Sequence, residues 1–472
     1  MDNRAQRIET LRRRLAERIL VLDGAMGTSL QQLGLSASDF GGEELEGCNE
    51  HLVVTRPDVV ERVHADFLAA GADIVETNSF GSTSVVLAEY GLDDQARRLS
   101  RLAAEIARRA AAAATTPEKP RFVAGSMGPT TKTISVTGGI TWQELAAAYH
   151  EQAAGLIEGG ADLLLVETSQ DTLNIKAALE GIDRANAELG TTVPAAVQGT
   201  VETMGTLLAG QDVEALYVSL AHRDLLWIGL NCATGPDFMT DHIRTLAQIS
   251  RFPVACVPNA GLPDEDGNYN ETPEMLAAKL ADFARQGWLN VVGGCCGTVP
   301  EHIERISAAV AGLPPRVAKP PRRCVVSGIE AYEISDEKRP VIVGERTNVL
   351  GSRKFRRLIA EDKLEEAAEI GRAQVRKGAA IVDVCLQDPD RDEAADLTRF
   401  LEILVKKVKA PIMIDSTDPV AIEQALERLQ GKSIINSINL EDGEAKFEAI
   451  VPLVKRFGAA VVVGCIDDDP EQ

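Results

Sequence analysis

The feature that most limits the fold of this chain is a pattern that repeats along its first 300 residues. A short apolar run rich in β-branched residues is followed by a turn with Gly or Asn, and then by a longer Ala- and Leu-rich segment with helical spacing. Eight such runs begin at Ile19, Ala72, Arg121, Ala161, Val193, Leu225, Pro253 and Leu289. Runs that are apolar throughout and separated by helices are typical of a parallel sheet. Eight of them in this length predict a closed (β/α)8 TIM barrel.

An open, doubly wound sheet is the alternative to a barrel. That fold would need a phosphate-binding turn after the first strand. The turn present there reads DGAMGTS, which lacks the Gly-x-Gly-x-x-Gly spacing. The sequence therefore favours the barrel.

The same α/β pattern restarts after a proline-rich segment. Residues 311–323 hold four prolines and four basic residues, which predicts a stiff, extended connector. Five further apolar runs begin at Val341, Ala380, Pro411, Ser433 and Ala459. We predict a barrel over residues 1–315, a linker over 316–335, and a second barrel over 336–472 that is incomplete after about five strands. Because five strands would leave an open edge, we expect the sequence to be a piece of a longer chain.

The charge balance narrows the classes of partner. There are 49 Lys and Arg residues against 71 Asp and Glu, a net charge of −22, which argues against nucleic acid or an anionic membrane surface as the main partner. No stretch approaches the roughly 18 apolar residues of a membrane span, and no export signal is visible. Eight cysteines in 472 residues are too few for a disulfide scaffold, so we expect a cytoplasmic protein with free thiols.

Three cysteines fall at the ends of predicted barrel strands. Cys232 ends the sixth strand in GLNCATG, and Cys295 and Cys296 end the eighth in GGCCGT. The flanking glycines permit the bend that would let neighbouring thiols reach one metal ion. Because reactive groups of such barrels gather at these ends, the three thiols predict a zinc site with an open fourth position. A buried inert pair and a redox-active vicinal disulfide are the alternatives for GGCCGT.

The remaining cysteines and the histidines give weaker signals. We expect four cysteines to pack or to stay free, namely Cys48, Cys256, Cys324 and Cys465. The six histidines show no spacing typical of metal ligands. His302, shortly after the cysteine pair, is predicted to begin a helix rather than to serve as a fourth ligand.

A three-thiolate zinc ion would lower the pKa of an incoming thiol, which favours alkyl transfer to sulfur over hydrolysis. Two carboxylates are predicted in the same mouth, Asp23 in LDGAMGT and Glu167 in VETS, and either could hold an α-ammonium group. The N–H groups after Gly24 could bind a carboxylate. Capping of loops is the alternative for each residue. Weaker candidates of the same kind are Glu76, Thr77 and Asn78.

The motifs LDGAMGT, VETNSF, VET, GLNC and GGCCGT, in this order, resemble the homocysteine S-methyltransferase family over residues 1 to about 315. The resemblance implies that Cys232, Cys295 and Cys296 bind a catalytic zinc ion, which takes the sulfur of homocysteine. It further implies that Asp23 and Glu167 hold the amino-acid end of this substrate.

Polar residues also end the strands of the second unit. They are Glu345 and Asn348 in GERTN, Asp383 in DVC, Asp415 in IDS and Asn436 in INS. Carboxylates and amides converging on a barrel mouth suit a flat heterocycle such as a pterin, whereas ion pairs and turn caps are the alternative.

These motifs resemble the pterin-binding methyltetrahydrofolate methyltransferase family, which implies hydrogen bonds from Asp415 and Asn436 to the pterin. One departure is Cys385, which stands where many relatives have Asn.

The order of the two units resembles the N-terminal part of the cobalamin-dependent methionine synthase family. The resemblance implies transfer of a methyl group from methyltetrahydrofolate, through cobalamin, to the zinc-bound thiolate of homocysteine, giving methionine and tetrahydrofolate. The D-x-H-x-x-G motif of cobalamin modules is absent, so a cobalamin-binding domain or protein outside these residues would supply the corrinoid. A fusion of the homocysteine barrel to a methylenetetrahydrofolate reductase, and a stand-alone thiol zinc-binding redox module, are the alternatives.

Overall fold

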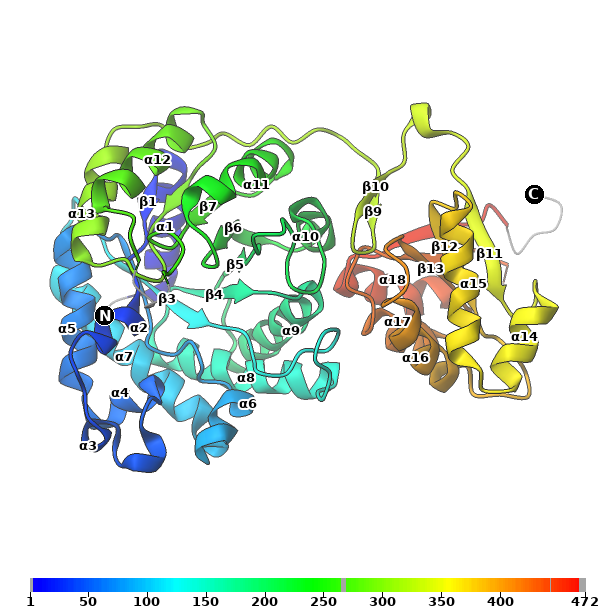
Figure 1. The fold of residues 1–472 in the computed structure, drawn as a ribbon, viewed down its shortest axis with the longest axis horizontal. Coiled ribbons are helices and arrows are strands. Elements are labelled where there is room, and N and C mark those ends of the chain that lie inside the picture. Colours follow the sequence, from blue (N-terminus) through cyan, green and yellow to red (C-terminus); the bar gives the residue numbers. More distant parts are fainter. Residues whose placement is uncertain (1–2, 265–268, 442, 467–472) are drawn as a thin grey trace.

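The computed structural model of the chain describes residues 3–264, 269–441 and 443–466. These residues form two α/β units joined by an extended segment that runs along one side of the molecule (Figure 1). The first unit contains eight parallel strands and the second contains a parallel sheet of five. The predicted fold class, a TIM barrel followed by a second, incomplete barrel, is confirmed.

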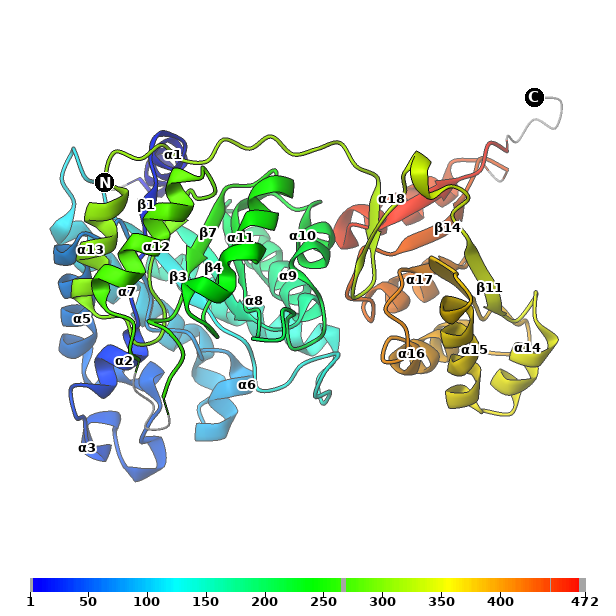
Figure 2. The same cartoon turned by 45° about the horizontal axis from the view of Figure 1, so that its top comes forward.

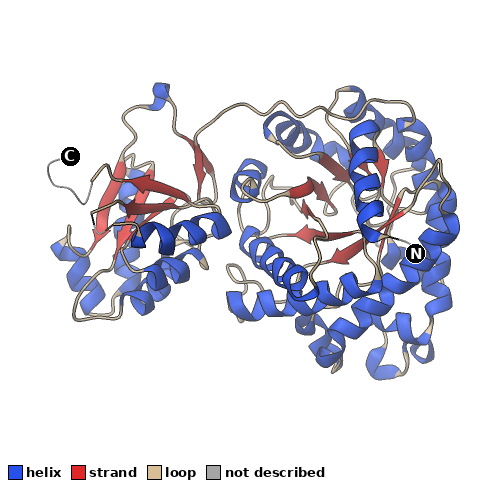
Figure 3. Ribbon diagram, turned by 180° about the vertical axis from the view of Figure 1, so that it is seen from behind, coloured by secondary structure: helices blue, strands red, loops and turns tan. Residues whose placement is uncertain are grey.

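The eight strands of the first unit follow one another around the barrel in sequence order. An isolated parallel bridge between Leu22 and Ile74 joins the first strand to the second and so closes the ring. Figure 3 shows the strands surrounded by helices. The strands are β1 (Leu20–Val21), β2 (Ile74–Glu76), β3 (Phe122–Met127), β4 (Leu163–Ser169), β5 (Ala195–Gly199), β6 (Leu225–Asn231), β7 (Val254–Val257) and β8 (Val291–Val292).

The helices of the first unit lie around the outside of this ring, except the N-terminal helix, which packs into its interior. No helix in the described part of the chain is long and apolar enough to cross a bilayer. The helices of the first unit are α1 (Arg4–Glu17), α2 (Met26–Gln31), α3 (Ala37–Phe40), α4 (Leu52–Thr55), α5 (Pro57–Ala70), α6 (Ser84–Leu87), α7 (Ala96–Ala114), α8 (Trp142–Gly159), α9 (Thr172–Leu189), α10 (Val213–Leu220), α11 (Pro236–Ile249), α12 (Pro273–Arg285) and α13 (Pro300–Val310).

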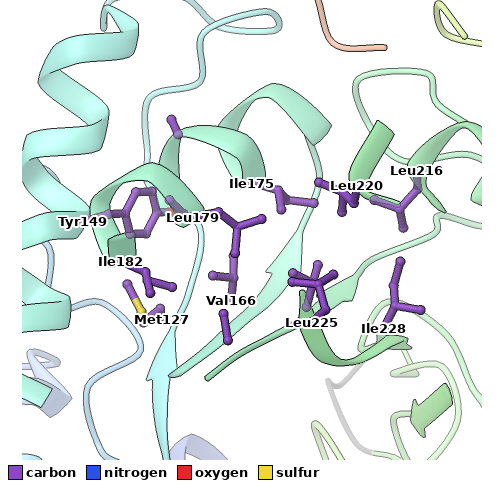
Figure 4. Close-up of a cluster of buried hydrophobic side chains, with 14 of the residues drawn as sticks. Met127, Tyr149, Val166, Ile175, Leu179, Ile182, Leu216, Leu220, Leu225 and Ile228 are labelled. Atoms are coloured by element: carbon purple, nitrogen blue, oxygen red, sulfur yellow. The ribbon is translucent and has the colours of Figure 1, made fainter. Parts of the chain in front are cut away.

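Two apolar layers hold the barrel together. The outer layer lies between strands and helices, where Leu179 and Ile182 of α9 approach Val166 of β4 (Figure 4). The inner layer fills the barrel itself and includes Leu11 and Leu15 of α1, so this N-terminal helix contributes to the barrel interior. Because side chains fill the interior of the barrel, a reactive site is expected at the ends of the strands.

The second unit is built on the strand order β11-β12-β13-β14-β15. All four pairings are parallel. Its strands are β11 (Val343–Asn348), β12 (Ile381–Cys385), β13 (Ile412–Asp415), β14 (Ile434–Ile438) and β15 (Ala460–Val463), and its helices are α14 (Arg353–Ala360), α15 (Leu364–Arg376), α16 (Glu393–Leu404), α17 (Pro419–Leu426) and α18 (Ala445–Phe457).

An antiparallel hairpin precedes this sheet and was not expected from the sequence. It consists of β9 (Val325–Ser327) and β10 (Ala331–Glu333) and lies within the segment predicted as linker. Val326 packs with Ile381, Met413 and Ile434, which lie at or near the starts of their strands. The hairpin therefore covers the N-terminal end of the second sheet, while the residues before Val325 run without regular structure.

The two units touch through a polar and aromatic interface. Figure 2 shows the second unit beside the part of the barrel that carries α9 and α10. The rings of Trp142 and Phe457 lie 5.3 Å apart between centroids. Arg456 of α18 forms an ion pair with Glu180 of α9 at 3.0 Å, and Lys176 Nζ donates to the Gly431 carbonyl at 2.7 Å. These contacts hold the second unit against the barrel wall.

Candidate functional site

The three cysteines predicted as metal ligands converge at the C-terminal mouth of the barrel. Their sulfur atoms all lie within 4.8 Å of one another. The sulfurs of Cys232 and Cys296 are 3.8 Å apart. Zinc bonds of about 2.3 Å in tetrahedral geometry place two sulfurs about 3.8 Å apart. The donor set and its spacing therefore fit a zinc ion held by three thiols with one position open.

The backbone around these cysteines explains how neighbouring thiols reach one point. Cys232 has a φ of 62° and so leaves the strand conformation directly after β6. After β8 the Cys295 N–H donates to the Pro258 carbonyl, and the Cys296 N–H donates to Asn259 Oδ1 at 3.1 Å. A Cβ atom on Gly294 would lie 2.5 Å from Thr298 Oγ1, so only glycine fits this turn. These hydrogen bonds connect the C-terminal ends of β7 and β8.

Two buried carboxylates lie at the same mouth, as predicted. Asp23 Oδ2 accepts a hydrogen bond from the Glu76 N–H at 3.0 Å, while Asp23 Oδ1 is buried without a partner. Glu167 Oε1 accepts from Ser126 Oγ at 2.5 Å, and Glu167 Oε2 accepts from Asn231 Nδ2 at 3.1 Å. Both carboxylates are thus fixed in place at the ends of β1 and β4.

Burial and neighbouring charges shift the pKa values of the side chains at this mouth. Burial raises the pKa of Glu167 to about 7. Burial, together with the nearby Glu167 charge, raises the pKa of Asp23 and of Glu76 well above the ordinary values. In contrast, hydrogen bonds from Cys232 and Cys295 lower the pKa of Cys296. The sulfur cluster therefore favours a thiolate at Cys296, while the pKa values of Cys232 and Cys295 are raised by their sulfur neighbours and by burial. The carboxyl groups keep their protons until a cation displaces the proton or the pH rises.

A cavity of about 240 Å³ joins the two groups. Its lining includes the three cysteines, Gly24 and the acidic residues Glu50, Glu76 and Glu167. A Cβ atom on Gly24 would lie 2.7 Å from the Phe67 ring, so a side chain there would disturb the cavity wall. Sulfur donors at one side and carboxylates at the other suit a small molecule that carries both a thiol and a cationic group.

Three residues at this site were not singled out from the sequence. Asn231 Nδ2 lies 3.9 Å from Cys295 Sγ and also donates to Glu167, so it connects the sulfurs to the carboxylates. Ser126 donates to the same carboxylate. Tyr269 lies against the turn at Gly297 and helps to lower the pKa of Cys296. Asn231 directly precedes Cys232 and shares the inward face of β6, a signal that strand alternation could have revealed.

The residues predicted as bystanders behave as expected. Cys48 and Cys256 are buried, Cys324 and Cys465 are exposed, and all are free thiols. His302 lies in the first turn of α13, where its Nδ1 accepts from the Val299 N–H and its Nε2 donates to the Glu271 carbonyl. The histidine thus serves the start of the helix and steadies the loop after β7.

The second unit also gathers polar side chains at the ends of its strands. Asn348 Nδ2 donates to Asp383 Oδ2 at 3.3 Å and to Asp415 Oδ2 at 3.0 Å. Burial, then the Asp415 charge, raises the pKa of Asp383 to about 7. Asn436 pairs with Asp415 in the sheet register, and the exposed Glu345 raises the pKa of Asp383 through its charge. Cys385 is buried at the end of β12, beside this group.

Comparison with protein families finds a family match for each of the two units. Residues 20–310 match the sequence model of the homocysteine S-methyltransferases, and residues 344–472 match that of the pterin-binding enzymes. The second match favours the pterin interpretation of this unit over the flavin reductase alternative.

Solved structures similar to this chain include homocysteine methyltransferase MmuM from Escherichia coli. The metallated form is 26% identical and has a TM-score of 0.51, and the match covers 65% of this chain and 99% of that one. The oxidized form is 26% identical with a TM-score of 0.49, over 61% of this chain and 95% of that one.

Proposed function

The chain belongs to the homocysteine S-methyltransferase family, and from this premise we propose that it methylates the sulfur of homocysteine to give methionine. The methyl group would come from methyltetrahydrofolate bound by the second unit, and cobalamin held by a module outside these residues would carry it between the two sites. The observation that supports this most directly is the meeting of three thiols and buried carboxylates around one cavity.

Each residue of the first site has a distinct task in this proposal. Cys232, Cys295 and Cys296 hold zinc, which when bound supplies a Lewis acid that lowers the pKa of an incoming thiol. Asp23 and Glu167 bind the α-ammonium group of homocysteine, and the backbone turn at Gly24 receives its carboxylate. Binding both ends of the substrate directs its sulfur toward the cysteines and limits the orientations from which it can react.

The second site holds the donor in this proposal. Asp383, Asp415 and Asn348 already form one hydrogen-bonded group, and Glu345 of β11 and Asn436 of β14 belong to the same sheet. Carboxylate and amide groups of this kind match the ring N–H donors and carbonyl acceptors of a pterin. Because the Asp383 carboxyl has a pKa of about 7, it can donate as well as accept a hydrogen bond near neutral pH.

The test joins metal content to methyl transfer. Wild-type protein is expected to hold about one zinc ion per chain and to convert homocysteine to methionine when methylcobalamin is added, whereas Cys295→Ser loses both properties. Cys324→Ser changes an exposed cysteine and serves as the control. Equal zinc content in all three proteins, or a zinc-loaded wild type that makes no methionine, would contradict the proposal.

A further inference from the structure

The cavity at the barrel mouth carries an unbalanced set of acidic side chains. Glu50, Glu76 and Glu167 line it, and Asp23, outside the lining, accepts a hydrogen bond from the Glu76 backbone N–H. No Lys or Arg is among the lining residues in the described part of the chain. Glu50 has a structural task, because its Oε1 accepts from the Gly81 N–H at 2.7 Å. The other three carboxylates remain without a cationic partner in this lining.

These three carboxylates form a connected group. Asp23 follows β1 by two residues, Glu76 ends β2 and Glu167 lies near the end of β4. The Glu76 carboxyl lies beside that of Glu167, and burial together with the charges of Glu167 and Asp23 raises the pKa of Glu76 well above its usual value, so this carboxyl keeps a proton. Asp23 Oδ1 is buried with no hydrogen-bond partner. The group thus contains one proton that a cation could replace and one oxygen that needs a donor.

The spacing of the group argues against a second metal ion. Among the described residues, the cysteine set is the one set of three acidic or metal-binding side chains whose ligand atoms lie close enough together to share an ion. Oxygen ligands must approach a divalent cation to about 2.0–2.6 Å. An ammonium group makes hydrogen bonds of about 2.7–3.2 Å and therefore suits acceptors that are further apart. It also brings three donors and the missing positive charge.

We propose that Glu76 is a third ammonium-binding residue, which together with Asp23 and Glu167 makes the site select thiols that carry an amino group. The inference rests on the proposed function, since it refines how homocysteine is recognised. The backbone N–H of Glu76 already orients Asp23, and its side chain already contacts Glu167, so one residue positions both of the other carboxylates. The ammonium group takes the place of the proton on Glu76 and gives Asp23 Oδ1 its donor.

The experiment compares two ligands on zinc-loaded full-length protein by titration calorimetry. L-Homocysteine carries the amino group, and 4-mercaptobutanoic acid has the same thiol and carboxylate without it. Glu76→Gln is expected to weaken homocysteine binding by about tenfold or more, as for loss of a charged partner, and to leave 4-mercaptobutanoic acid binding within about twofold. Glu202→Gln removes the same charge from a loop of this face outside the cavity lining and serves as the matched control.

The outcomes separate the inference from its premise. Equal weakening of both ligands would assign Glu76 a purely structural task, and unchanged homocysteine binding would remove it from the site, so either result overturns the inference. A zinc-loaded wild type that binds no homocysteine overturns the proposed function as well. If Glu76→Gln folds poorly, Glu76→Asp retracts the carboxylate while keeping its charge, and the same selective loss is expected.

Discussion

Replacing Lys176 with methionine tests how the two units are held together. The side chain lies at the interface, where it is 7% exposed and donates to the Gly431 carbonyl. Burial lowers the pKa of Lys176 from 10.5 to about 7. In the unfolded chain the amine regains its ordinary pKa, so the folded protein binds this proton less tightly than the unfolded chain does.

The sign and size of the effect follow from this difference. A lowered lysine pKa destabilises the folded state fully below pH 7, and the cost disappears as the pH rises above the pKa of the unfolded chain. At about 1.4 kcal/mol per pH unit, the shift costs about 4 kcal/mol at pH 7, of which about 2 kcal/mol is recovered between pH 7 and pH 9. Methionine has a similar length and no charge, so Lys176→Met should abolish the increase in stability between pH 7 and pH 9. The loss of the hydrogen bond to Gly431 costs about 1–3 kcal/mol at every pH.

Urea unfolding at pH 7, 8 and 9 provides the assay. Trp142 packs against Phe457 across the interface, so tryptophan fluorescence reports separation of the units together with unfolding. The free energy of unfolding of the wild type should rise with pH by about 2 kcal/mol more than that of Lys176→Met. Lys377→Met, at an exposed position, should keep the pH dependence of the free energy of unfolding that the wild type shows. If the free energy of unfolding depended on pH in the same way in the wild type and in Lys176→Met, the assigned cost of burying this amine would be refuted.

Two further predictions concern the binding sites. Because the pKa of Glu167 is raised to about 7, its carboxylate charge is present above that pH and lost below it. Calorimetry should therefore show that the preference for homocysteine over 4-mercaptobutanoic acid increases from pH 6 to pH 8. A constant preference would speak against recognition of the amine by this carboxylate. Asp415→Asn removes a charged acceptor of Asn348 and should weaken methyltetrahydrofolate binding by about tenfold without changing the homocysteine dissociation constant. A parallel loss at both sites would indicate unfolding instead.

The sequence was sufficient to predict the strands and much of the first site, for a physical reason. Parallel strands buried on both faces require long apolar runs, and such runs stand out against the helices that separate them. Since their C-terminal ends must meet at one mouth, Cys232 and Cys295 could be brought together without knowing any distance. The prediction therefore depended on topology rather than on contacts.

The hairpin β9–β10 shows where this reasoning stops. Each of its strands has three residues, too few for an alternating pattern to emerge from the surrounding proline-rich sequence. Val326 becomes a strand residue because it packs on Ile381 and Ile434, which are more than 50 positions away. Tertiary contacts of this kind override weak local preferences, and a single sequence does not display them. The interface around Lys176 and Gly431 escaped prediction for the same reason.

The charge of the barrel mouth has a further consequence for how substrate enters. Without ligand, a proton on Glu76, whose pKa is raised by burial and by the charges of Glu167 and Asp23, reduces the repulsion among the buried carboxylates. If an ammonium group replaces that proton, one positive charge leaves as another arrives, so the net charge of the buried group stays the same. The ammonium group of homocysteine can then enter without adding uncompensated charge to a site of low dielectric, where such charge is costly. A thiol without an amine leaves the proton on Glu76 in place and Asp23 Oδ1 without a donor, and this difference is the physical basis of the expected selectivity.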